Sequence, residues 1–128
     1  NICSNEALMA LTSAVYLSTV GWNGLKEAAW QSYIKAHYLA EHLTAIDGIE
    51  FTFPDKPFWC EFALSFKDFK ARENFVEQLK KEGIFAGVRL CALTGCQKDS
   101  NVLLVAVTEK RTACEIDKYI EIAGRVMK

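Results

Sequence analysis

The chain has 128 residues, of which 51% are hydrophobic and 24% are charged, so it is long enough to form one domain with a sizeable core. Its 15 basic and 16 acidic residues leave a net charge of −1, which argues against a nucleic-acid-binding protein because such proteins concentrate Lys and Arg. The five cysteines form an odd set without a CxxC pair, which favours free thiols in a reducing compartment, and we expect a cytoplasmic protein.

The first predicted element is a helix that carries no charge between residues 7 and 20. Asn5 can cap this helix, Glu6 lies in its first turn, and Gly21 is the kind of residue that ends a helix. Glycines interrupt the apolar run before it reaches the roughly 20 residues that a membrane span needs, so we expect no membrane role. A helix that is apolar on nearly all sides is typical of a buried helix, and we expect part of its partner surface to be missing from this chain.

The rest of the chain predicts a mixture of helices and strands. A second helix runs from Leu25 to about Ile46, and the Asp47-Gly48 pair ends it. In chain order we then expect strands at 49–53 and 59–66, a helix at 69–82, a strand at 84–90, a loop at 92–101 and a buried strand at 102–107.

The last helix begins with a capping box, because Thr112 and Glu115 have the required residue types and spacing. Its predicted buried stripe consists of Ile116, Tyr119, Ile120, Ala123 and Val126. The complete order of elements predicts an α+β fold, with connector helices in residues 1–46 and a small α+β domain in residues 47–128.

Candidate metal ligands and nucleophiles are few and poorly spaced. Cys91 and Cys96 are the closest thiol pair, with Cys60 and Cys114 as further members, but structural zinc sites have tighter spacing. His37 and His42 are five residues apart on a helix, whereas metal ligands on helices prefer a spacing of four. The aromatic run at 51–59, "FTFPDKPFW", lacks flanking basic charge, so we expect strand and core residues there and no stacking surface.

Six segments of the chain resemble one family in unbroken order. They are "NICSNEAL", "KAHYLAEHL", "GIEF", "FWCEFAL", "GIFAGVRL" and "LLVAVTEKRTACEID". Together they are similar to glycine decarboxylase, the P-protein of the glycine cleavage system, in its split subunit 1 form. The resemblance implies the C-terminal part of a fold-type-I pyridoxal-phosphate (PLP) enzyme, in which a long helix leads from a large domain to a small domain with a mixed or antiparallel sheet. It also implies that Asn1 is a cut end and that the uncharged helix is this connector.

The resemblance further implies an activity that this chain does not carry alone. The complete enzyme decarboxylates glycine through PLP and passes aminomethyl to the lipoyl arm of H-protein, and in split enzymes we expect PLP on the partner, subunit 2. Many relatives place a carboxylate-binding Arg on the penultimate strand of the small domain, where this chain has only Val102, Leu103 and Leu104. Arg89 and Arg111 lie outside that strand, so we assign no catalytic, cofactor-binding or metal-binding residue and expect the isolated chain to be inactive and to self-associate.

Two other interpretations remain open. A ferredoxin-like regulatory or interaction module would match residues 49–127, but it would not need the uncharged helix. The small domain of another fold-type-I enzyme, such as an aminotransferase or a cysteine desulfurase, would lack the opening "NICSN" and would carry the strand Arg.

Overall fold

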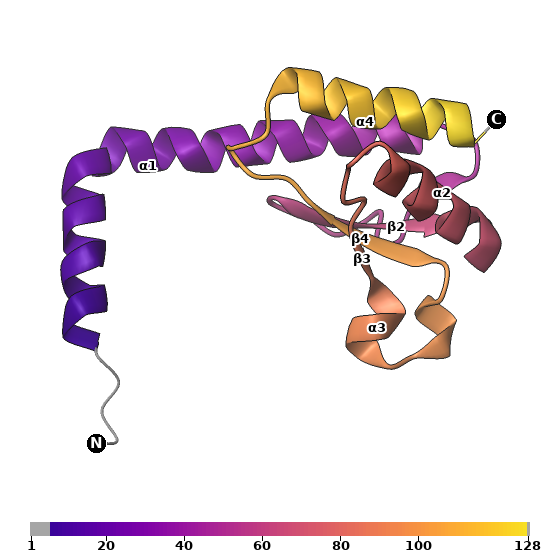
Figure 1. Ribbon diagram of the computed structural model, residues 1–128, viewed down its shortest axis with the longest axis horizontal. Helices are drawn as coiled ribbons and strands as arrows, with labels where there is room; N and C mark the ends of the chain where they lie inside the picture. The colour runs from indigo at the N-terminus through magenta and orange to yellow at the C-terminus, as the bar shows by residue number, and fades with distance from the viewer. Residues whose placement is uncertain (1–5, 128) are drawn as a thin grey trace.

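The computed structural model describes residues 6–127 and contains five helical segments and four strands in that range (Figure 1). In chain order these are α1 (Glu6–Thr44), β1 (Ile49–Phe51), β2 (Glu61–Phe66), α2 (Phe69–Lys81), β3 (Val88–Arg89), α3 (Leu90–Thr94), the 3-10 turn η1 (Gln97–Asp99), β4 (Val102–Ala106) and α4 (Ala113–Val126). The predicted Asn5 cap and Cys3 lie outside the described residues.

Helix α1 bends sharply at Gly21. This residue has φ 63° and ψ 179°, a backbone conformation that is essentially restricted to glycine. The bend divides α1 into an arm (residues 6–20) and a stem (residues 22–44), and Figure 1 shows that the arm descends on the same side of the stem as the sheet. The prediction that a first helix ends at Gly21 is confirmed, whereas the second helix begins directly after Gly21 and not at Leu25.

The four strands form one antiparallel sheet in the order β1-β2-β4-β3. The register places Ile49 opposite Phe66, and Leu64 opposite Leu103. The stem of α1, together with α2 and α4, covers one face of this sheet (Figure 1). The predicted α+β fold is confirmed, and the sheet, which was expected to be mixed or antiparallel, is antiparallel.

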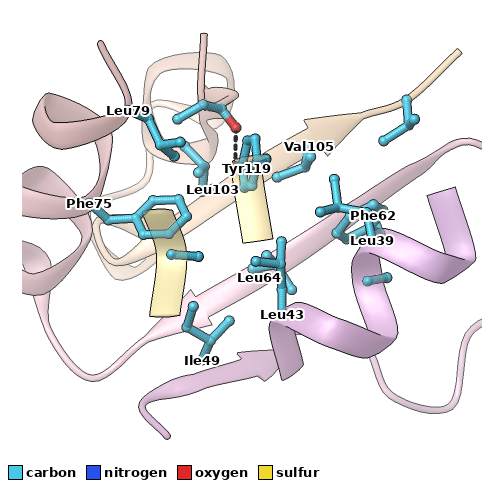
Figure 2. Close-up of a cluster of buried hydrophobic side chains, with 14 of the residues drawn as sticks. Leu39, Leu43, Ile49, Phe62, Leu64, Phe75, Leu79, Leu103, Val105 and Tyr119 are labelled. Atoms are coloured by element: carbon cyan, nitrogen blue, oxygen red, sulfur yellow. Dashed lines mark hydrogen bonds between the residues drawn. The ribbon is translucent and has the colours of Figure 1, made fainter. Parts of the chain in front are cut away.

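The core lies between that face and the three helices (Figure 2). Alternate residues of β2 and β4 point into it, as a strand period of two requires, and the stem, α2 and α4 contribute the facing side chains. The members labelled in Figure 2 are Leu39, Leu43, Ile49, Phe62, Leu64, Phe75, Leu79, Leu103, Val105 and Tyr119. The Tyr119 hydroxyl donates a hydrogen bond of 2.7 Å to the carbonyl oxygen of Ala86, and burial raises the pKa of this phenol.

Three details of the sequence-based prediction are wrong. The strand expected at 84–90 pairs only at Val88 and Arg89, because Gly87 (φ 144°) turns the preceding residues away and Tyr119 holds the Ala86 carbonyl. The loop expected at 92–101 contains α3, which ends at a left-handed Gly95, and η1. In α4 the buried stripe includes Ile122, whereas Ile120 and Val126, which were expected there, are only partly buried.

Candidate interaction surface

The arm exposes nearly all of its apolar side chains. Every residue from 6 to 19 is exposed, and the exposed fractions of Leu8, Leu11 and Val15 are 57%, 62% and 58%. An apolar surface of this extent on one element is typical of a protein interaction site. Between residues 6 and 127 we find no helix that is long and apolar enough to cross a membrane.

The threonines of the arm add to its apolar character. The Thr12 hydroxyl donates to the carbonyl oxygen of Leu8 at 2.8 Å, and the Thr19 hydroxyl donates to that of Val15 at 2.7 Å. These bonds satisfy the hydroxyl donors within the helix itself, so the two side chains present mainly their methyl groups to a neighbour. The arm can therefore be buried without leaving these donors unpaired.

A continuous stack of rings runs along the stem. The Trp30 and Tyr33 rings stack with centroids 5.6 Å apart, His37 lies 3.9 Å from Tyr33, and Phe58 stacks on His37 at 4.0 Å. We call these four residues the aromatic ladder. Phe58 also packs 5.3 Å from Phe62 of β2, so the ladder connects a surface residue to the core.

The aromatic run at 51–59 agrees only in part with the prediction of strand and core residues. Phe51 and Phe58 pack against the core, but Phe53 and Trp59 remain 56% and 57% exposed. The Trp59 indole N–H donates to the carbonyl oxygen of Ala29 at 3.2 Å, which attaches this loop to the stem. The expectation of strand and core residues is therefore confirmed for Phe51 and Phe58 and wrong for Phe53 and Trp59, because the loop turns the last two rings towards the solvent.

The turn between β4 and α4 is held on the stem by polar contacts. The backbone N–H of Glu109 donates to the Ser32 hydroxyl at 3.0 Å, and Lys35 donates to the Glu109 carbonyl at 2.7 Å. The predicted capping box is present, since Thr112 and Glu115 each bond the backbone N–H of the other. The bond from the Thr112 backbone N–H lowers the pKa of the Glu115 carboxyl.

The weak candidates for metal or thiol chemistry are four cysteines and two histidines of the described residues. No group of three His, Cys, Asp or Glu side chains among residues 6–127 is placed to hold a metal ion. The two histidine Nδ1 atoms lie 2.9 and 2.8 Å from the carbonyl oxygens of Tyr33 and Tyr38, one turn earlier in the stem. Cys60, Cys91, Cys96 and Cys114 are free thiols, and burial raises the pKa of Cys60, which makes it a poorer nucleophile.

One buried cation was not predicted from the sequence. The Arg72 side chain on α2 is fully buried and lies 2.8 Å from the Glu73 carboxylate, which also accepts two hydrogen bonds from Arg89. None of the three guanidinium nitrogens of Arg72 makes a hydrogen bond among the described residues, since its contact with Glu73 is an ion pair only, and the guanidinium lies 4.9 Å from the Phe69 ring centroid. The only signal in the sequence is its spacing from Phe75 and Leu79, which places it on the core face of α2.

The cavity nearest the end of β4 has no free charge at its mouth. It has a volume of about 530 Å³ and lies between residues 83–88, the end of β4 and α4. Its rim cations are already paired, Arg111 with Glu115 at 3.5 Å and Lys118 with Glu82 at 3.4 Å. We therefore assign the exposed arm and the neighbouring aromatic residues, and not this cavity, as the candidate functional surface.

Comparison with known proteins gives a consistent result. Residues 1–123 match the family model described as the glycine cleavage system P-protein. The chain is 43% identical over 121 residues to the probable glycine dehydrogenase (decarboxylating) subunit 1 of Chlorobium limicola, covering 94% of this chain and 26% of that protein. It is 44% identical over 124 residues to the protein of the same description from Carboxydothermus hydrogenoformans, covering 97% of this chain and 26% of that protein.

A solved structure agrees with these relatives. The crystal structure of glycine decarboxylase (P-protein) of the glycine cleavage system, in inhibitor-bound form, superimposes with a TM-score of 0.76 at 30% sequence identity. The superposition covers 98% of this chain and 27% of that one. The chain therefore spans about a quarter of the length of the proteins that it matches.

Proposed function

The chain belongs to the glycine cleavage system P-protein family, and we propose that it forms the C-terminal region of subunit 1 of a glycine dehydrogenase (decarboxylating). The observation that carries this proposal is the family match over residues 1–123, which includes the exposed arm as well as the α+β domain. A free-standing ferredoxin-like module is not favoured, because it would leave the arm unexplained. The small domain of a different fold-type-I enzyme is not favoured either, because the relatives share one description.

We propose that the complete protein works in the cytoplasm as part of an assembly. In this proposal, subunits 1 and 2 together decarboxylate glycine with PLP and pass aminomethyl to the lipoyl group of H-protein. PLP supplies the electron sink for loss of the carboxylate when it is bound.

The described residues of this chain do not fit PLP. A lysine that forms a Schiff base needs a desolvated or cation-adjacent pocket that lowers its pKa. The lysines between residues 26 and 118 are exposed or half-buried, and Lys35 and Lys118 are engaged with Glu109 and Glu82. We therefore derive no catalytic step for this chain and assign it a structural role, in which the arm packs against the remainder of subunit 1.

The test is chemical labelling of the purified chain. The chain is mixed with PLP, reduced with borohydride and analysed by mass spectrometry for pyridoxyl-lysine. We expect sparse labelling scattered over several lysines. Stoichiometric labelling of one lysine, with an aldimine absorbance band, would contradict the proposed division of labour.

A further inference from the structure

We propose that the aromatic ladder and Trp59 form a second docking surface, beside the arm, for the part of the P-protein polypeptide that lies outside this chain. The inference rests on the proposed function. The partner polypeptide contacts this docking surface with an apolar surface that has recesses for indole rings. Trp30 and Trp59 are the two anchors of this surface.

The anchors are exposed but already ordered. Trp30 is 55% exposed, yet its ring lies parallel to that of Tyr33, with an interplanar angle of 14°. Trp59 is 57% exposed, yet its N–H is bonded to the Ala29 carbonyl, one residue before Trp30. Binding therefore has little side-chain freedom left to remove, and tryptophan and tyrosine are the residues most often found at the energetic centres of interfaces.

The ladder lies on the side of the stem towards which the arm bends. His37 stacks on Phe58, which packs on Phe62 of β2, so the ladder lies on the sheet side of the stem. The arm descends on the same side (Figure 1). Trp22, which is 78% exposed, is three helical turns before Tyr33 and so extends the ladder's face up to the bend.

The spacing and the charge of the residues on this face point to one large apolar partner. Trp22 and Trp30 are about 12 Å apart along the stem, whereas even a domain of 100 residues has a radius of gyration of about 13 Å. A domain that packs against the arm inside the bend therefore also reaches the ladder. Lys26 is the one charged side chain on this face of the described stem between residues 22 and 37.

The length of the matched relatives indicates which polypeptide covers this docking surface. This chain covers 26% of the matched subunit 1 proteins, so nearly three quarters of their length lies outside it. The arm and the stem that carries the ladder are joined at the Gly21 bend, so one polypeptide can contact both.

The experiment measures binding of this chain to the remaining subunit 1 polypeptide, supplied as a separate chain. We expect Trp30→Ala and Trp59→Ala each to raise the Kd about 30-fold or more, as loss of an interface anchor does. Phe85→Ala is the matched control, because Phe85 is 80% exposed but precedes β3 at the opposite edge of the sheet, and its Kd should change less than threefold.

A second measurement covers variants that fail to fold. Hydroxyl-radical footprinting of the unmodified chain should show that oxidation of Trp30 and Trp59 falls several-fold on binding, while oxidation of Phe85 stays constant. Suppose that Leu11→Ser weakens binding, but both tryptophans are still oxidised in the bound chain and their alanine variants bind with an unchanged Kd. The ladder is then not an interface, and the proposed function still stands. If the unmodified chain does not bind the remaining polypeptide at all, both the inference and the proposed function are wrong.

Discussion

Replacing Gly21 with alanine should straighten α1. Gly21 has φ 63° and ψ 179°, and nothing lies within 4 Å of the position that a Cβ would occupy. The substitution therefore causes no clash and acts only through the backbone. Alanine disfavours this conformation by about 1–3 kcal/mol and favours a continuous helix by about 1 kcal/mol relative to glycine.

Both contributions favour the straight helix, and together they lower the population of the bent form relative to the straight form at least tenfold. A continuous helix over the 39 residues of α1 would be about 58 Å long, whereas the bent arm and stem span less than their summed lengths. The variant chain should therefore have a larger maximal dimension, by on the order of 10 Å, than the unmodified chain.

Small-angle X-ray scattering on the monomeric fraction from size exclusion measures this dimension. Ser13→Ala is the control, because Ser13 is an exposed residue within the arm and its replacement leaves the bend unchanged. An unchanged dimension for Gly21→Ala would show that contacts other than the glycine backbone impose the bend. In that case the backbone of Gly21 is not the cause of the bend.

Further predictions concern stability and association. Thr112→Ala removes the N-cap of α4 and should lower the unfolding free energy by about 1 kcal/mol; superimposable thermal melts would contradict the cap. The contacts of Glu115 lower its pKa, so its carboxylate stabilises the folded chain at a pH above the pKa that it has in the unfolded chain. This stabilisation should be lost as the pH falls through the lower pKa of the folded chain. If acidification lowers the melting temperature of Glu115→Gln as much as that of the unmodified chain, this prediction is wrong. Arg72→Met removes buried hydrogen-bond donors that have no acceptor, while Glu73 keeps its ion pair with Arg89. The free energy of unfolding measured in urea should therefore be unchanged or about 1 kcal/mol higher. A loss above about 2 kcal/mol would contradict this account. The isolated chain should self-associate through the arm, and Leu11→Ser should weaken that association in sedimentation velocity; a clean monomer with a protected arm would refute it.

Element boundaries that depend on local chemistry were predictable from the sequence. Gly21 ends the arm because of its backbone freedom, and the Thr112–Glu115 pair starts α4 because each side chain bonds the backbone of the other. The alternating core residues of β2 were also predictable, because apolar residues recur at every second position of its sequence.

Features that depend on distant contacts were not predictable. Helix α3 has only five residues, too few for a helical period to show in the sequence. The exposure of Trp59 depends on how the loop after β1 folds against Ala29, which is 30 residues earlier in the chain. The burial of Arg72 depends on how α2 packs on the sheet, and its spacing from Phe75 and Leu79 is the only sign of it in the sequence.

Reconstitution of glycine decarboxylation tests the central claim most directly. The remaining subunit 1 polypeptide, subunit 2, PLP and H-protein are combined with or without this chain, and exchange of carbon dioxide with the glycine carboxyl is measured. We predict exchange only when this chain is present, no exchange from this chain with PLP alone, and reduced exchange when the chain carries Trp30→Ala. Full exchange without this chain, or exchange by this chain alone, would contradict the account.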